Sequence, residues 1–138
     1  MFAKLHIVTG GLLGLSSVLL GAFGAHGLRN LVSAASISSW QTGVSYQMFH
    51  ALALLIIGLW LRQGGAKLLN WAAILFSLGV LTFSGSIYLL VLFQVSWIGP
   101  ITPLGGLLLI AGWLCLCLAA LKLDETTDAA RQDSRDRR

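Results

Sequence analysis

Four long apolar runs dominate the chain, and charged residues or turn-forming glycine and proline mark their ends. The hydrocarbon core of a bilayer is about 30 Å thick and is crossed by about 20 helical residues. The pattern predicts membrane spans at about residues 5–23, 42–61, 68–92 and 103–121, joined by a polar stretch around residues 28–45 and by turns at 62–67 and 94–102. We therefore expect an all-α fold, an integral membrane four-helix antiparallel bundle.

The composition excludes an ordinary soluble domain. Apolar residues make up 57% of the chain, charged residues only 10%, and the mean hydropathy is +0.84. A soluble domain carries about 25% charged residues on its surface. Here every acidic residue lies at or after Asp124, so residues 1–123 form the membrane bundle. Residues 124–138 hold five acids and four bases with little apolar content, and we expect a disordered, charged cytoplasmic tail.

The basic residues set the expected orientation rather than indicating nucleic-acid binding. Outside the charged tail they stand singly at the ends of the apolar runs, where they anchor helices at lipid headgroups. With four spans, one side holds Lys4, Arg62, Lys67, Lys122 and the four arginines of the tail, while the other side holds Arg29. Because basic loops stay in the cytoplasm, both termini are expected there. The first run exceeds the 7–15 apolar residues of a signal peptide, which favours a retained span over a cleaved one.

Small residues mark the faces through which the helices should pack. The first span carries Gly10, Gly14, Ser17, Gly21 and Gly24, spaced four, three, four and three residues apart. That spacing places all five on one helix face. Lipid gives little hydrophobic drive for helix association, so small residues that allow close backbone approach are favoured at interfaces. Shorter sets of the same kind occur in the third and fourth spans, at Ser77, Ser84, Gly105, Gly112, Cys115 and Ala119.

His50 is the most informative polar residue, because its position in the second span places it about 17 Å from the inner boundary, near the midplane. Ionisable residues at that depth face the bundle interior or a cavity. Tyr46 and Gln47 are close enough along the helix to reach toward it. The other polar candidates of the outer half are His26, Ser84, Ser86, Tyr88 and Thr102. We expect a neutral His50 that is hydrogen-bonded to Ser84, Ser86 or Tyr88 of the third span.

Three interpretations of this polar cluster stay open from the sequence. It is a set of interhelical hydrogen bonds, a site for a ligand or a proton relay, or a metal or haem pair made by His26 and His50. The last lacks a nearby carboxylate or thiolate to complete a metal shell. The spans also lack Asp and Glu, phosphate-binding loops and a nucleophile elbow, and a Ser84–His50 pair has no third orienting group. We therefore predict no enzyme activity, no metal and no cofactor.

Five short motifs occur in order along the chain. They are GAFGAHGL (residues 21–28), WQTG (40–43), YQMFHALA (46–53), FSGSIYLL (83–90) and ITPLGG (101–106), followed by GW (112–113). The set resembles the family of small uncharacterised bacterial inner-membrane proteins typified by YgdD, which is similar to eukaryotic transmembrane protein 256. The resemblance covers residues 5–120 and implies a multi-pass protein of the cell inner membrane. It brings no established activity, and it places family motif positions on the polar candidates named above and on Pro103.

The sequence thus favours a non-enzymatic membrane scaffold or accessory subunit of a larger assembly. The alternative is a binding or transport-related bundle that holds a lipid head group, a quinone or a small solute at the polar cluster around His50. The expected partners are the lipid bilayer and either another membrane protein or a second copy of the chain, with no nucleic acid.

Overall fold

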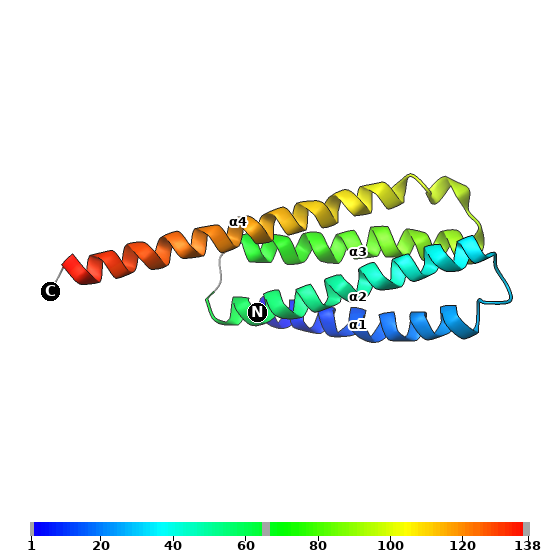
Figure 1. Ribbon diagram of the computed structural model, residues 1–138, viewed down its shortest axis with the longest axis horizontal. Coiled ribbons are helices and arrows are strands. Elements are labelled where there is room, and N and C mark those ends of the chain that lie inside the picture. Colours follow the sequence, from blue (N-terminus) through cyan, green and yellow to red (C-terminus); the bar gives the residue numbers. More distant parts are fainter. Residues whose placement is uncertain (1, 65–66, 137–138) are drawn as a thin grey trace.

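The computed structural model describes residues 2–64 and 67–136, with the side chains of Ser96 and of residues 123–136 left out. Its elements are four α-helices, α1 (Phe2–His26), α2 (Ala34–Arg62), α3 (Lys67–Phe93) and α4 (Ile101–Asp136), and a short 3-10 turn, η1 (Ser96–Ile98). Each α-helix holds a segment long and apolar enough to cross a membrane, which in α4 is Ile101–Lys122. The expectation of an all-α bundle with four membrane spans is confirmed (Figure 1).

Local capping explains where α2 begins and ends. The Ser33 side chain accepts a hydrogen bond from the backbone N–H of Ser36 (3.1 Å), so Ser33 caps the helix and α2 starts at Ala34. Its 29 residues span about 43 Å, more than the hydrocarbon thickness, and the helix therefore extends into the headgroup region. Beyond Arg62, Gly64 adopts a φ of +94°, a left-handed conformation that glycine adopts without strain.

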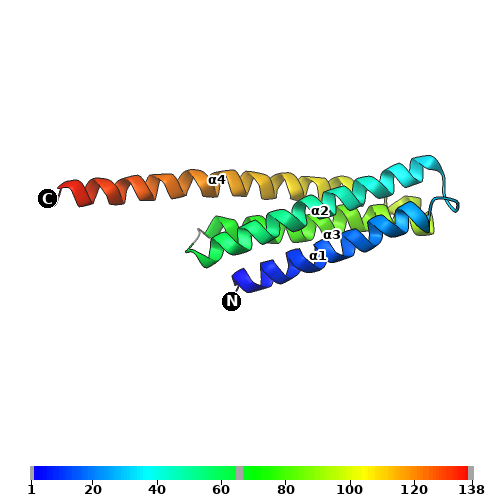
Figure 2. The same ribbon diagram turned by 60° about the horizontal axis from the view of Figure 1, so that its bottom comes forward.

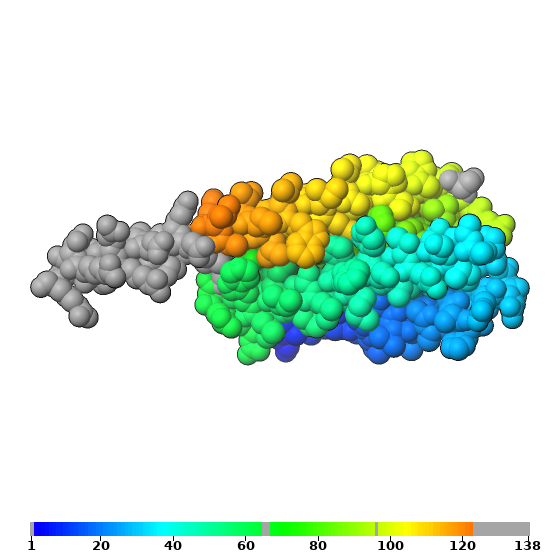
Figure 3. Space-filling view, viewed as in Figure 1, coloured from blue at the N-terminus to red at the C-terminus, as the bar shows by residue number. Residues whose placement is uncertain are grey.

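The helices are antiparallel, and neighbours in the sequence are neighbours in space. The close helix pairs are α1 with α2, α2 with α3, and α3 with α4, and α1 and α4 lie on opposite flanks (Figures 1 and 2). The N-terminus and the α2–α3 turn lie at one end of the bundle, and the α1–α2 loop lies at the other with the α3–α4 connection (Figure 1). On the face shown in Figure 3, α2 and α4 run along each other with part of α3 visible between them.

Two apolar clusters fill the interior. The larger one joins α2, α3 and α4 around Leu54, Ile57, Leu69, Phe76 and Leu109. The smaller one lies toward the α1–α2 loop and contains Leu28, Trp40, Ile87 and Val91. The outer faces of α1 and α4 carry exposed leucine, valine and isoleucine side chains along their length, as expected of surfaces that meet lipid.

The helical backbone of α4 continues through the charged residues up to Asp136. A disordered tail is expected at residues 124–138. The side chains of residues 124–136 lie outside the described part of the chain, and residues 137–138 lie outside it altogether. The expectation of disorder there stays a prediction.

Candidate functional site

Gln47 joins three helices. Its side-chain nitrogen donates to the backbone oxygen of Leu13 (2.9 Å) and to the Ser16 hydroxyl (2.8 Å), both on α1. Its side-chain oxygen accepts from the Tyr88 hydroxyl on α3 (2.9 Å). The amide is buried, with 4% of the residue exposed, and its hydrogen bonds run to α1 and α3 rather than to His50.

His50 is held at both ring nitrogens. Nδ1 lies 2.7 Å from the backbone oxygen of Tyr46, and Nε2 lies 3.1 Å from the indole nitrogen of Trp113 on α4. Because an indole N–H can only donate, Nε2 accepts and Nδ1 carries the proton that is donated to Tyr46. This arrangement corresponds to a neutral imidazole. The rings of Phe76 and Trp113 pack edge-on to it at centroid distances of 5.0 and 5.9 Å.

The prediction that His50 hydrogen-bonds to a residue of α3 is wrong. Ser84 donates to the backbone oxygen of Gly43 (2.8 Å), and Ser86 pairs with Thr102 on α4 (2.7 Å) and donates to Phe83 (2.9 Å). The spacing of residues along one helix shows which of them share a face. It does not show how the neighbouring helix is rotated about its axis, and so it does not show which residues of that helix meet this face. These serines nevertheless connect helices, α3 to α2 and α3 to α4 respectively.

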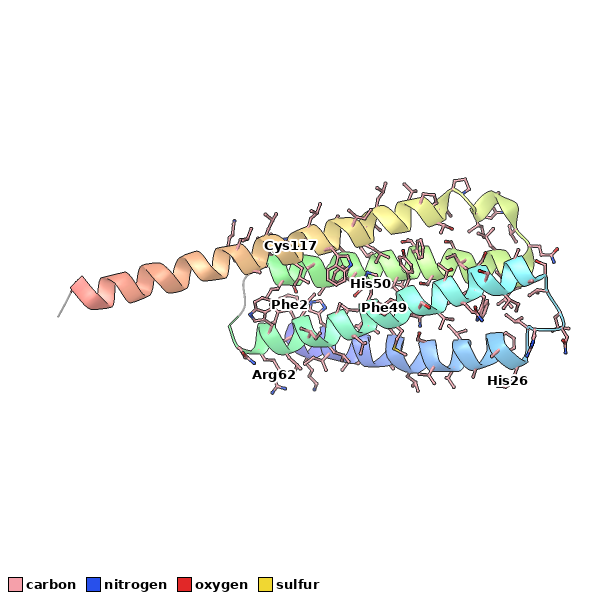
Figure 4. The ribbon with its side chains drawn as sticks, in the orientation of Figure 1. Phe2, His26, Phe49, His50, Arg62 and Cys117 are labelled. Atoms are coloured by element: carbon pink, nitrogen blue, oxygen red, sulfur yellow. The ribbon has the colours of Figure 1, made fainter. Side chains whose placement is uncertain are left out.

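In the described part of the chain, Tyr46 and His26 add no side-chain hydrogen bond to these contacts, but only His26 stands apart from them. The Tyr46 ring is 42% exposed and stacks on the His50 ring at a centroid distance of 6.1 Å, as its spacing along the helix predicts. It also packs against Phe83 at 4.6 Å, and within the described residues its hydroxyl has no hydrogen-bond partner. His26 is exposed at the end of α1, whereas His50 lies midway along α2 (Figure 4). The structure therefore does not bring the two histidines together.

The five small residues of the first span all meet α2. A Cβ at Gly10 would lie 2.8 Å from the backbone oxygen of Ala51, and one at Gly24 would lie 2.5 Å from the Trp40 ring. Gly14 and Gly21 face Ala51 and Val44 with more room, at 3.9 and 3.4 Å. The Ser17 hydroxyl is buried and donates to the backbone oxygen of Val44 (2.9 Å). This face is therefore the contact surface between α1 and α2.

Besides the Trp113–His50 bond, sequence reasoning missed polar contacts made by residues outside the expected cluster. The ring of His6 on α1 lies 2.8 Å from the side-chain oxygen of Asn70 on α3, and the Trp40 indole donates to the backbone oxygen of Leu20 (2.8 Å). The signal for His6 was available, because it precedes Gly10 by four residues and so shares the small-residue face. Asn70 was the matching polar residue at the start of the third span.

The buried polar groups are thus engaged within the bundle. No buried side-chain nitrogen or oxygen of the described residues lacks a hydrogen-bond partner. In the same part of the chain, no three His, Cys, Asp or Glu residues come together as a potential metal site. The arrangement joins each helix to its neighbours, and it is suited to fixing their relative positions.

Four apolar helices joined in this way define a multi-pass helical membrane protein. Comparison with known proteins gives the family. The chain belongs to the family described as protein of unknown function (DUF423), whose model matches residues 20–106. The expected kinship with a small uncharacterised membrane-protein family is confirmed.

Bacterial relatives match over nearly their full length. UPF0382 membrane protein SH2409 of Staphylococcus haemolyticus is 49% identical over 120 residues, which cover 86% of this chain and 97% of the relative. UPF0382 membrane protein SSP2132 of Staphylococcus saprophyticus is 45% identical over 121 residues, covering 87% and 99%. No solved structure matches the chain. The names of these relatives state a membrane location and no activity.

Proposed function

We propose that this protein is a non-enzymatic scaffold or accessory subunit of a larger assembly in the bacterial inner membrane. The observation that carries the proposal is the use of the buried polar side chains, which hydrogen-bond across helices instead of facing a shared cavity. Gln47 joins α1, α2 and α3, and the Trp113–His50 bond joins α4 to α2. Such groups stabilise a defined shape.

The chemistry of the bundle supports the non-enzymatic part. Residues 1–123 contain no carboxylate side chain, so paired-carboxylate catalysis has no groups to use. The imidazole of His50 has both nitrogens engaged, one by Tyr46 and one by Trp113. A general base must instead have a nitrogen within reach of the proton that it abstracts.

The flanking helices offer the surface for assembly. α1 packs mainly against α2 and α4 mainly against α3, with the His6–Asn70 and Trp113–His50 contacts reaching one helix farther, so each leaves a long apolar face outside the bundle. A membrane-protein partner or a second copy of the chain would meet the bundle there, through positions such as Leu12 and Leu19 of α1 or Leu107 and Leu114 of α4, all exposed.

The alternative function, a bundle that holds a lipid head group, quinone or solute around His50, has less support at that residue. A ligand there would have to displace Trp113 from Nε2. Ser84, the other polar residue expected at such a site, donates its hydroxyl proton to the backbone oxygen of Gly43. The support for binding lies farther toward the α1–α2 loop, where Thr102 borders a groove.

Site-specific photo-crosslinking in intact cells tests the scaffold function. A crosslinking residue at Leu12 or Leu107 should give one discrete protein adduct from the face that meets the assembly. The same residue at Leu54, which is 0% exposed, should give none. Lipid adducts alone at all exposed positions, together with a purified protein that runs as a monomer, would overturn the proposal.

The orientation proposed is both termini in the cytoplasm. The end of the bundle with the N-terminus and the α2–α3 turn carries Lys4, Arg62 and Lys67, and the opposite loop carries Arg29. A reporter that is active only in the cytoplasm should work when fused after Arg138, and a periplasmic reporter should work when inserted at Asn30. The reverse pattern at either position would exclude this orientation.

A further inference from the structure

A groove of about 440 Å³ opens between α2, α3 and α4 at the end of the bundle that holds the α1–α2 loop. Its polar wall consists of hydroxyl-bearing residues of α2 and the first turn of α4, and its apolar wall belongs to α3. The lining residues are Ala35, Ser36, Ser39, Thr42, Ile87, Leu90, Val91 and Thr102. Pockets that hold small molecules measure about 300–1,000 Å³, so the space is large enough for a ligand.

The groove lies at the boundary between headgroups and hydrocarbon. Twenty residues counted back from Leu61 place Thr42 at the edge of the hydrocarbon core. Leu90 and Val91 belong to the last turn of α3, which ends at Phe93. Ser36 and Ser39 lie one to two turns farther out on α2. The polar wall therefore extends into the headgroup layer, while the apolar wall faces the first methylene groups of the acyl chains.

Three of the four hydroxyls that line the groove, those of Ser39, Thr42 and Thr102, direct their protons away from it. Ser39 donates to the backbone oxygen of Ala35 (3.1 Å), and Thr42 donates to that of Ser38 (3.0 Å). Since Ser86 donates to Phe83, the proton between Ser86 and Thr102 comes from Thr102. Each hydroxyl oxygen keeps a lone pair that can accept. The groove thus selects a ligand that brings N–H or O–H donors.

We propose that this groove binds a phospholipid headgroup that carries hydrogen-bond donors, a primary ammonium or a glycerol hydroxyl, from the leaflet at the α1–α2 loop end. Its donors meet Ser39, Thr42 and Thr102, and the start of an acyl chain lies along Ile87 and Leu90. The phosphate faces the beginnings of α2 and α4, both of which lack acidic residues in the first turn. The proposal does not rest on the scaffold function.

Headgroup selectivity tests the proposal. Phosphatidylethanolamine has three N–H donors, whereas phosphatidylcholine with the same acyl chains has none. Native mass spectrometry of the full-length protein in mixed micelles of the two lipids should show preferential retention of phosphatidylethanolamine. Equal retention of the two lipids would overturn the proposal. If an equal concentration of soluble glycerophosphoethanolamine displaces the lipid, the acyl chain contributes nothing to binding. That result would overturn the proposal that the ligand is a lipid.

The variant Ser39→Ala/Thr42→Val should lower phosphatidylethanolamine retention about tenfold, the effect of losing two ordinary hydrogen bonds. Both hydroxyls bond only their own helix, so the melting temperature should match that of the wild type. Thr82→Val is the matched control, because Thr82 bonds its own helix at Leu78 in the same way but lies outside the groove. An unchanged retention in the double variant, or an equal loss in Thr82→Val, would refute the site.

Discussion

The α1–α2 hairpin and the α3–α4 hairpin both bring two helices into backbone contact, but they use different side chains to do so. In α1–α2, side chains of one helix hydrogen-bond to backbone oxygens of the other. Ser17 donates to Val44, Trp40 to Leu20, and Gln47 to Leu13. Small residues of α1 leave the room for these bonds.

The α3–α4 hairpin relies on glycines that face large apolar side chains. A Cβ at Gly105 would meet the backbone of Phe83, and one at Gly112 would lie 2.6 Å from the Phe76 ring. In the opposite direction, a Cβ at Gly79 of α3 would collide with the Leu109 side chain of α4. Ser86–Thr102 is the polar contact between these helices.

The difference shows two ways of associating helices where lipid removes most of the hydrophobic drive. The first hairpin combines close approach with directional hydrogen bonds, so its register is fixed by polar groups. The second fixes its register by shape, since each glycine makes room for one particular residue of the facing helix, its side chain or its backbone. Substitutions that add volume should therefore affect the second hairpin most, and substitutions that remove polar groups should affect the first.

The largest effect is expected for Gly105→Ala. The added methyl group would lie within 2.7 Å of the Phe83 Cα, a backbone atom that cannot rotate away, and we expect a loss of about 3 kcal/mol in unfolding free energy. Gly106→Ala is the matched control, because its nearest neighbour would be 3.8 Å away, and its effect should stay within about 0.5 kcal/mol. Thermal unfolding in one detergent measures both, and equal tolerance would show that α3 and α4 are not in contact.

A somewhat smaller loss is expected for Gly10→Ala, about 2 kcal/mol, because the methyl group would lie 2.8 Å from the Ala51 oxygen. A methyl group at the adjacent Gly11 would meet no atom of another helix within 4 Å, so Gly11→Ala should leave the melting temperature unchanged or raise it. If the two variants unfold at the same temperature, the small-residue face of α1 meets lipid instead of α2.

Gln47→Leu should cost about 1 kcal/mol, since polar pairs in membranes contribute about 0.6 kcal/mol on average and this amide makes three hydrogen bonds. Tyr88→Phe removes one of these bonds and should cost less. Gln41→Leu, at an exposed position of the same helix, serves as the control for the change in side-chain type. A loss in Gln41→Leu as large as that in Gln47→Leu would contradict the structural role of the amide.

The smallest effect is the coupling between His50 and Trp113, expected at about 0.6 kcal/mol and at most about 1.7 kcal/mol. A double-mutant cycle with His50→Leu and Trp113→Phe measures it, because the phenyl ring keeps the aromatic contact and removes the N–H donor. Trp71→Phe, at an exposed tryptophan of α3, should show no coupling to His50. Coupling of His50 to Ser84 in place of Trp113 would contradict the observed pairing.

Properties that depend on one helix at a time were predictable from the sequence. Hydropathy and length give the number of spans, and the spacing of small residues gives the face of α1. Counting residues also gives the position of His50 midway along its helix (Figure 4), while its depth in the membrane stays a prediction. The start of α2 at Ala34 lies eight residues before the expected span, because membrane thickness limits the apolar part of a helix and not its capped end at Ser33.

Properties that depend on the rotation of one helix against another were not predictable. Trp113 belongs to the recognised GW motif, yet nothing in the sequence aims its indole at His50. Leu13 shows the same limit, since it lies next to Gly14 but packs against the interior cluster and accepts a hydrogen bond from Gln47. Such pairings come from side-chain packing between segments far apart in the chain.

The pairing of sequence neighbours bears on how the protein is made. A chain enters the membrane from its N-terminus onward, and elements that contact their sequence neighbours can associate before the rest has been synthesised. The first hairpin can therefore dock in the bilayer as soon as Arg62 has left the ribosome. Two hydrogen bonds, Gln47 with Tyr88 and Ser84 with Gly43, can form only after the third helix has entered the membrane. Their formation is therefore a late step, which joins the completed first hairpin to the second.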